Sequence, residues 1–370
     1  MNDDLVPPPL RREDLLRAAA EAGYVVSERL LETLRSQGLV PRPRRTANNG
    51  VRPVWSYPAG ADGQLVAVMA YRAHTKDPAT LRALLWLDGH AIDTATGREA
   101  LAAVLDQTCR ELENALTAEA ERLGKAGPGS RDRALESLAG QLSGRRGSHA
   151  LPRRVRVKAA DRADAVVRLL RAFAFGEQQG VSEDDALMAE RVLGISPGRR
   201  DRVADAGPWL TGPAAELFEF GAGVTSLPAI TGSVAAAGDD ELERARVLAQ
   251  TLVAGLALAS RVLDEATGSA NRAGLQAVSD LAGEPFVRLL MVGLATSLIS
   301  RGYAEQLEHV TAAAGRFQPL LGDLDRVLEM PASTVARNLR RAEPEVRASA
   351  TRLIDAALDG RLKPGPAAGM

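Results

Sequence analysis

The feature that most restricts the fold is a pair of short helical segments followed closely by a hairpin signal. Leucines and alanines recur at helical spacing over residues 12–22, and Gly23 ends the pattern. Ser27 is a residue type that caps helices, so a second helix is expected over residues 28–37, closed by Gly38. Two short helices joined by a tight turn that contains glycine make a helix-turn-helix pattern.

The segment after Gly38 is extended rather than helical. Residues 40–45 contain two prolines and three arginines, Asn48-Asn49-Gly50 is a strong turn signal, and residues 51–57 alternate like a strand. This pattern predicts a small hairpin. Helical patterns then resume at residues 61–74 and 78–88, where Asp77, Pro78 and Gly89 mark the ends of the second helix.

Charge is distributed unevenly, although the net charge of the chain is only −1. Five arginines and no acid lie between residues 35 and 52, where the hairpin is expected. Eight basic residues against two acids lie between residues 127 and 158. Because local patches set the field that a phosphate backbone meets, the basic hairpin favours a nucleic-acid partner. For residues 127–158, a solvated linker is a better interpretation than direct contact with DNA.

Residues 11–92, about a quarter of the chain, resemble the DNA-binding domain of the MerR family of transcription regulators. The similarity is carried by residues at family-like spacing: Val26-Ser27-Glu28-Arg29-Leu30-Leu31, Gly38-Leu39, Pro41, Arg44-Arg45, Asn49-Gly50, Arg52, Tyr57-Pro58 and Gln64-Leu65. The resemblance implies a winged helix-turn-helix domain over residues 1–92, with double-stranded DNA as its partner.

The candidate contacts with DNA lie on the second helix and on the hairpin. On a helix that begins after Ser27, leucines point inward and residues 28, 29, 32, 35 and 36 point outward, where such a helix meets base edges. Hairpin arginines would contact phosphates with salt-dependent affinity, and Trp55 and Tyr57 would brace the hairpin. The resemblance implies base or backbone contact at residues 29 and 35, and backbone contact from the hairpin. The candidate DNA-binding residues are Ser27, Arg29, Arg35, Arg42, Arg44, Arg45, Arg52 and Tyr57.

Two departures from the family pattern favour a different function. Glu32-Thr33-Leu34 stands where the family usually has Arg-Tyr-Tyr, and outward glutamates weaken attraction to phosphate, although a carboxylate can accept from a cytosine amino group. Family members also begin with a short strand, which residues 7–10 match poorly. The alternative to a regulator is a protein-interaction adaptor whose winged domain does not bind DNA.

A long helix is expected over residues 96–125, since one stripe carries Leu101, Leu105, Leu112, Leu116 and Leu123. The resemblance implies that this connecting helix, within residues 93–126, pairs with a second copy to form a homodimer. The alternative is that the stripe packs on the C-terminal half of the same chain. Cys109 in this helix is interpreted as a small buried apolar residue rather than a thiol switch.

Residues 159–370 show helical patterns and no strand signal, which predicts an all-α domain after a basic linker at residues 127–158. That linker contains one possible short helix near residues 133–142. Helices are expected at residues 161–179, 182–193, 213–220, 239–264, 275–281, 285–300, 304–320 and 333–359. The sequence leaves open whether this domain binds an effector, contacts a protein partner or supports assembly. Aromatic residues that either line an effector pocket or form plain core are Phe173, Phe175, Trp209, Phe218 and Phe220. The fold class expected for the chain is mainly α.

No constellation of residues favours an enzyme. His74, His90, His149 and His309 are isolated from one another, and no metal-ligand pattern is present. The single cysteine excludes a disulfide framework and a thiolate zinc cage, so we expect no cofactor.

The apolar stretches at residues 247–259 and 289–300 are shorter than a bilayer requires, and the N-terminus lacks the pattern of an export signal. We therefore expect no membrane partner. The expected function is that of a cytoplasmic, dimeric transcription regulator whose helical half senses a small-molecule or protein effector.

Overall fold

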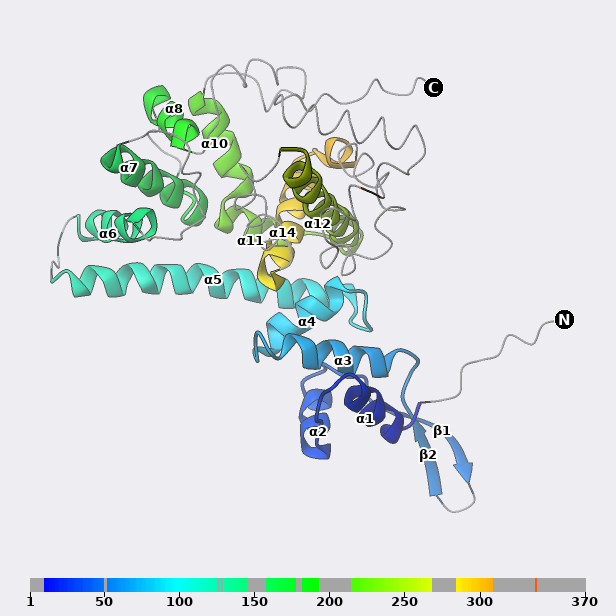
Figure 1. Ribbon diagram of the computed structural model, residues 1–370. Coiled ribbons are helices and arrows are strands. Elements are labelled where there is room, and N and C mark those ends of the chain that lie inside the picture. Colours follow the sequence, from blue (N-terminus) through cyan, green and yellow to red (C-terminus); the bar gives the residue numbers. More distant parts are fainter. Residues whose placement is uncertain are drawn as a thin grey trace, which may run out of the picture. The chain divides into compact units, whose positions relative to one another are not determined.

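The chain is mainly helical, as expected, and divides into two compact units. The computed structural model in Figure 1 describes residues 10–49, 52–124, 127, 129–144, 158–177, 182–192, 214–267, 284–308 and 337. Unit 1 is Met1–Val104 and unit 2 is Leu105–Met370. Among the described residues, no helix combines the length and the apolar character that crossing a membrane requires.

Unit 1 consists of helices and one short hairpin. Its elements are α1 (Arg12–Glu21), α2 (Glu28–Ser36), β1 (Arg44–Asn49), β2 (Arg52–Ser56), α3 (Ala61–Tyr71), α4 (Pro78–Leu87) and the first part of α5 (Thr94–Arg122). The helices begin and end close to the residues expected from their capping signals. Gly38 has a φ of 70°, and this left-handed conformation lets the chain turn out of α2 at low cost.

The hairpin pairs β1 and β2 in antiparallel register, with Arg45 opposite Trp55 and an irregularity between Arg45 and Ala47. Below the hairpin, Leu10 forms an isolated bridge to Tyr57, whose N–H donates to the Leu10 carbonyl at 2.8 Å. Residues 7–10 were expected to match poorly the short strand with which family members begin. Of these residues the structure describes Leu10, which forms this one strand-like bridge.

One hydrophobic core joins helices α1 to α4 of unit 1. Its buried members are Leu15, Ala19, Leu31, Leu34, Leu39, Val40, Tyr57, Ala61, Leu65, Val68, Leu81 and Leu85. Helix α4 is buried on more than one side, because Leu84, Trp86 and Leu87 are also almost fully covered. Gly97 permits a close approach to Trp86, since a Cβ there would lie 2.4 Å from Trp86 Cγ.

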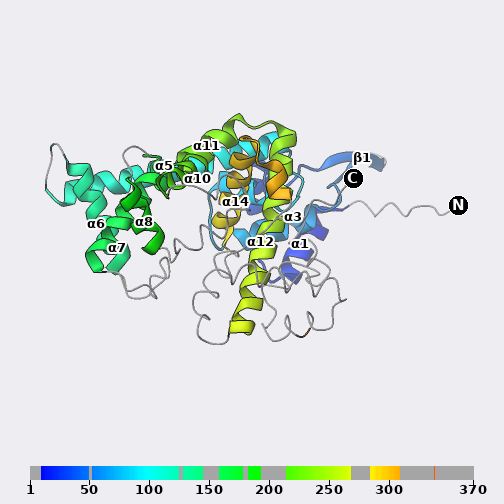
Figure 2. The same ribbon diagram turned by 90° about the horizontal axis from the view of Figure 1, so that it is seen from above.

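In unit 2, α5 is followed by two groups of helices in chain order (Figure 2). The first group is α6 (Ser130–Gly144), α7 (Ala159–Leu169), the π-helical turn η1 (Leu170–Ala174) and α8 (Glu183–Val192). The second is α10 (Ala214–Thr225), α11 (Leu227–Ala236), α12 (Asp239–Thr267) and α14 (Pro285–Ile299). The two groups are joined by the packing of α10 against α8 and η1.

The part of α5 that belongs to unit 2 buries its apolar stripe against helices of the same chain. Leu116 packs with residues of α6 and α7, among them Leu135 and Val166. Leu105 is fully buried, close to Gly293 of α14. This packing supports the alternative in which the stripe serves the chain itself at Leu105 and Leu116, whereas Leu112 and Leu123 are only partly buried.

Two elements differ from the sequence expectation. Residues 130–144, expected to be part of a basic linker with at most a short helix, form the packed helix α6, because Ala134, Leu135 and Ala139 bury one face of it. Helix α11 was not expected, since Pro228 and Gly232 resemble loop residues; Pro228 instead stands in the first turn, where a missing N–H costs nothing.

Several expectations fall outside the described residues. They concern Trp209, the arginines between residues 145 and 156, and the helices expected at residues 275–281, 309–320 and 333–359 apart from residue 337.

Candidate nucleic-acid interface

Contacts at both ends hold α2 in place. At its start, Ser27 is extended and its hydroxyl accepts a hydrogen bond from the Leu30 N–H at 3.2 Å, so Ser27 acts as an N-cap. At its end, Arg82 Nε of α4 donates to the Gln37 carbonyl at 3.1 Å. The inner face of α2 packs Leu31 and Leu34 into the core. The opposite face of α2 is therefore presented to solvent in a defined orientation.

Gln64 of α3 fixes the chain where it leaves α2. Its side chain is almost fully buried, and its Nε2 donates to the Leu39 carbonyl at 2.9 Å. Its Oε1 accepts from the Ala91 N–H at 3.3 Å. Sequence reasoning quoted Gln64 only as part of a family resemblance and missed this structural role. The available signal was a polar residue one position before Leu65, on the buried side of a helix.

Both outward glutamates of α2 are paired with arginines of the same unit. Arg12 Nη1 of α1 lies 3.2 Å from the carboxylate of Glu28, and Glu32 is paired with Arg35 one turn later in α2. Such exposed pairs add little to stability. Their consequence is electrostatic, because two carboxylates that would repel a phosphate are each neutralised by a guanidinium.

Arg35 does not lie on the open face, which corrects the expectation from helical spacing. Its side chain is only 23% exposed, and Nη1 donates to the Tyr57 hydroxyl at 2.9 Å. Tyr57 is itself 5% exposed, so its ring belongs to the core rather than to the outer surface of the hairpin. Arg35 and Tyr57 therefore join the last turn of α2 to the end of the hairpin, and both are already engaged within the unit.

Arg29, Arg42 and Arg44 are the cations of this region that remain for a partner. All three are exposed, and within the part of the chain that the structure describes none of them contacts a carboxylate. Arg45 is also exposed. The side chain of Arg52 lies outside the described residues, while its backbone pairs with Asn49 in the hairpin.

The hairpin carries arginines on both of its faces. Arg44 and Arg45 are neighbours in β1, and successive side chains of a strand point to opposite faces. Arg45 stands opposite Trp55, which is 54% exposed, whereas Arg44 stands opposite the buried Ser56. The hairpin extends away from the helices of unit 1 (Figure 1). It can therefore offer positive charge on either side of its ribbon.

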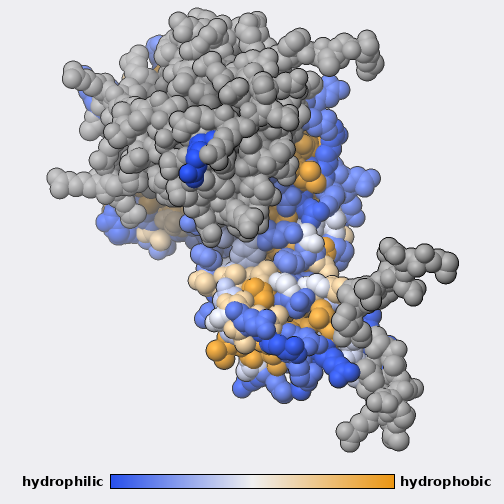
Figure 3. Space-filling view, turned by 45° about the vertical axis from the view of Figure 1, so that its right-hand side comes forward, coloured by the Kyte–Doolittle hydropathy of each residue, from blue (hydrophilic) through white to orange (hydrophobic). Residues whose placement is uncertain are grey.

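Unit 1 has no large apolar face in the view of Figure 3, where hydrophobic residues are scattered among hydrophilic ones. Among the described residues of the unit, two large hydrophobic side chains are nevertheless exposed, Val25 before α2 and Trp55 on the hairpin. They flank the exposed arginines in the sequence. Such a surface suits a charged partner, because arginines can contact anionic groups and isolated apolar side chains can add local apolar contacts.

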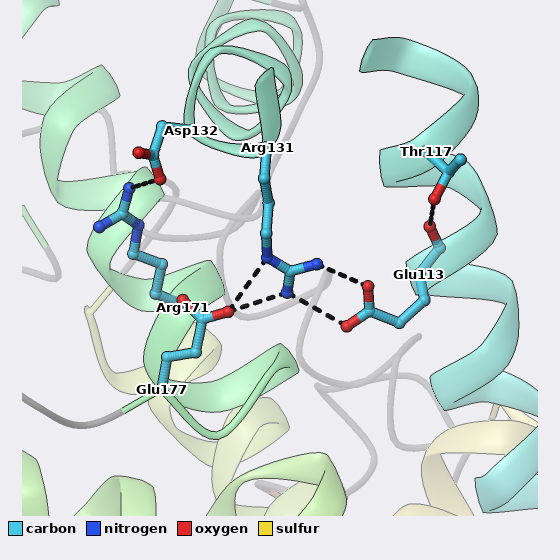
Figure 4. A network of polar contacts seen from close by, with 6 residues as sticks. All are labelled: Glu113, Thr117, Arg131, Asp132, Arg171 and Glu177. Atoms are coloured by element: carbon cyan, nitrogen blue, oxygen red, sulfur yellow. Dashed lines mark hydrogen bonds and ion pairs between the residues drawn. The ribbon is translucent and has the colours of Figure 1, made fainter. Parts of the chain in front are cut away.

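A polar network in unit 2 has a structural role (Figure 4). Arg131 of α6 donates to Glu113 of α5 at 2.7 and 3.1 Å and to Glu177 at 2.8 Å. Its guanidinium also lies 4.9 Å from the centre of the Phe175 ring. The adjacent Glu113 carboxylate, with Glu177, raises the pKa of Arg131. Arg131 thus ties α6 to α5 and to the segment after η1.

The aromatic residues considered for an effector pocket take part in separate contacts. Phe173 and Phe218 meet edge to face with ring centres 5.4 Å apart, and Phe220 meets Tyr303 in the same way at 5.6 Å. Phe175 lies under the Arg131 guanidinium. The four phenylalanine rings are each partly buried and contact neighbouring elements, while Trp209 lies outside the described residues.

Cys109 of α5 is half-buried, and its Sγ lies 3.8 Å from Thr231 Oγ1 of α11. Burial raises the pKa of the Cys109 thiol, so the less reactive protonated form is favoured. Among the residues that the structure describes, no three His, Cys, Asp or Glu side chains are grouped to hold a metal ion.

Comparison of the chain with protein-family models, curated proteins and solved structures gives no match. What the chain does must therefore be inferred from its own residues. The exposed arginines of unit 1 are the feature whose chemistry points most directly to a class of partner.

Proposed function

We propose that the chain is a transcription regulator that binds double-stranded DNA through unit 1, used as a winged helix-turn-helix of the MerR type. One observation carries the proposal. Pairing of Glu28 and Glu32 within the unit leaves Arg29, Arg42 and Arg44 exposed, without a carboxylate partner among the described residues. In this arrangement α2 enters the major groove and the hairpin follows the phosphates.

The start of α2 has the chemistry that such a helix needs. The dipole of a helix places partial positive charge at its N-terminus, and Arg29 lies in this first turn. The carboxylate of Glu28, which would oppose phosphate there, is held by Arg12. Positive charge from Arg42 and Arg44 then supplies affinity through release of counterions from the duplex.

Unit 2 is, in this proposal, the part that senses a small-molecule or protein effector. Regulators of this kind bind two-fold operators as dimers. Since Leu105 and Leu116 of the leucine stripe of α5 are buried within the chain, a homodimer formed along α5 would use the partly buried Leu112 and Leu123.

The test compares the salt dependence of DNA binding in two double variants. Fluorescence anisotropy with a labelled duplex, at several salt concentrations between about 50 and 200 mM, gives the slope of log K against log salt. Removing two phosphate contacts with Arg42→Ala and Arg44→Ala is expected to reduce that slope by about 1.8. The matched control, Arg17→Ala with Lys76→Ala, removes two exposed cations elsewhere in unit 1.

A hairpin variant whose slope equals that of the unaltered chain would show that the hairpin arginines do not contact phosphate. Loss of slope in the hairpin variant alone supports the proposal. Equal loss in both variants would indicate attraction to the net charge of the unit rather than to a defined surface.

A protein-interaction adaptor is the second candidate, and the internal use of Arg35 favours it. Of the eight predicted contact residues, Arg35 and Tyr57 bond to each other and Ser27 caps α2. Fewer side chains are therefore free for DNA than the sequence suggested. For an adaptor, the unaltered chain and the hairpin variant would bind duplex equally weakly at about 50 mM salt.

A further inference from the structure

Val25 is 93% exposed although both of its neighbours pack against the core of unit 1. The chain between α1 and α2 is not helical, and Ser27 at its end is extended. Successive side chains of an extended chain point to opposite sides. Because Tyr24 and Val26 turn inward, Val25 is forced outward. Its exposure is a consequence of how α2 is anchored.

Single exposed hydrophobic residues are common on protein surfaces, so the exposure of Val25 alone indicates no function. Its position in the unit is what suggests one. Val25 lies two residues before the N-cap of α2, at the end of the helix that faces base edges in a helix-turn-helix complex. The polar side chains at this end are engaged within the unit, Ser27 with the Leu30 N–H and Glu28 with Arg12. Two exposed groups near the start of α2 have no such contact among the described residues: the methyl groups of Val25 and the guanidinium of Arg29.

We propose that Val25 contacts the 5-methyl group of a thymine in the major groove and makes the chain select a duplex with thymine at that position. The inference rests on the proposed function of unit 1. Among the four bases of DNA only thymine carries a methyl group in the major groove, and an aliphatic side chain recognises it by apolar contact. Arg29, the second residue of α2, is the polar group that would contact guanine or phosphate beside it.

The thymine methyl group can be removed from the duplex without changing the protein. A preferred duplex is first selected from a random-sequence pool with the full chain. Each thymine is then replaced singly by deoxyuridine, and binding is measured by fluorescence anisotropy. We expect one position per half-site at which deoxyuridine weakens binding about fourfold, because burying one methyl-sized group contributes about 0.8 kcal/mol.

The variant Val25→Ala is expected to bind the thymine and deoxyuridine duplexes equally at that position. The substitution leaves the fold intact, since Val25 is not part of the core of unit 1. Val247→Ala is the matched control, because Val247 of α12 is 52% exposed and belongs to unit 2. The control variant is expected to keep the fourfold preference for thymine.

The two levels of the proposal fail in different ways. The chain could select a preferred duplex and yet show no position that distinguishes thymine from deoxyuridine, or Val25→Ala could keep the preference for thymine. Either result overturns the role of Val25 and leaves DNA binding by unit 1 intact. If the pool yields no preferred duplex and the hairpin variant binds like the unaltered chain, DNA binding itself is refuted. An effect of Val25→Ala only on contact with a protein would assign this side chain to the adaptor instead.

Discussion

Replacing Gln64 by glutamate tests how unit 1 holds the start of its hairpin. In the native chain the Gln64 amide donates to the buried Leu39 carbonyl at 2.9 Å and accepts from the Ala91 N–H at 3.3 Å. Gln64→Glu keeps the shape of the side chain but exchanges the amide donor for a carboxyl group. A carboxylate facing the Leu39 oxygen would be repelled, whereas a protonated carboxyl can donate to it.

The new carboxyl group is therefore expected to have a folded-state pKa well above its unfolded value of about 4.3. A raised pKa means that the variant is nearly as stable as the native chain below about pH 4.3 and loses stability as the pH rises. The loss grows by about 1.4 kcal/mol per pH unit until the folded-state pKa is reached. If that pKa is 7 or higher, the variant is less stable by about 4 kcal/mol at pH 7.

Urea unfolding at several pH values measures this difference. Trp86 of α4 is almost fully buried in the same unit, and Trp55→Phe with Trp209→Phe leaves it as the only tryptophan of the chain. Ala73→Glu, which adds a carboxylate at an exposed position after α3, is the control. A stability difference that stays constant between about pH 4.5 and 7 would refute the reasoning, because it would show that the carboxylate is hydrated and not buried.

Three further predictions concern close packing and one buried carboxylate. Gly97→Ala places a Cβ 2.4 Å from Trp86 Cγ, so the melting temperature should fall, since overpacking costs about 1–3 kcal/mol and the gain in helix propensity is at most about 1 kcal/mol. Gly293→Ala brings a Cβ to 2.4 Å from Ile230 Cγ2, so the double variant with Ile230→Ala should lose less stability in urea unfolding than the sum of the two single losses; strict additivity of the two substitutions would contradict this contact. The pKa of Glu119 is lowered to about 2 by hydrogen bonds from Arg122 and Ser137, so the stability that Glu119 contributes is present above its unfolded pKa of about 4.5 and is lost as the pH falls toward 2. The difference in unfolding free energy between the native chain and Glu119→Gln should shrink over that range, and a difference that is independent of pH would exclude the effect.

Local signals in the sequence were sufficient for the elements of unit 1. Ser27 and Gly38 mark the ends of α2 because a cap and a left-handed glycine act on the nearest residues. The Asn-Asn-Gly turn likewise predicts the hairpin from adjacent residues. These features need no knowledge of the rest of the chain.

Contacts between distant residues could not be predicted in the same way. The bond from Arg35 to Tyr57 joins residues 22 positions apart, and the pair of Arg12 with Glu28 depends on how α1 packs beside α2. Helical spacing placed Arg35 outward, and only the packing of α2 against the end of the hairpin turns it inward.

The leucine stripe of α5 shows a different limit. A stripe reports that one face of a helix is buried, but its pattern is the same whether a second copy or the same chain covers it. Leu116 packs on α6, a helix that the composition of residues 127–158 had concealed as a basic linker. Because residues 130–144 were interpreted mainly as linker, α6 was not recognised from the sequence as the helix that covers Leu116.

The candidate site itself depends on a property that neither composition nor spacing contains. By count, the outward face of α2 has as many acids as arginines, which argues against phosphate. The acids are paired, one by a helix that does not belong to that face and one by an arginine that also serves Tyr57. Exposed ion pairs contribute little to the free energy of unfolding. Their main effect here is on the electrostatic potential at the surface of α2. What a duplex would meet on α2 is therefore Arg29 beside two neutralised carboxylates, and the charge of the site is determined by internal pairing rather than by the number of charged residues.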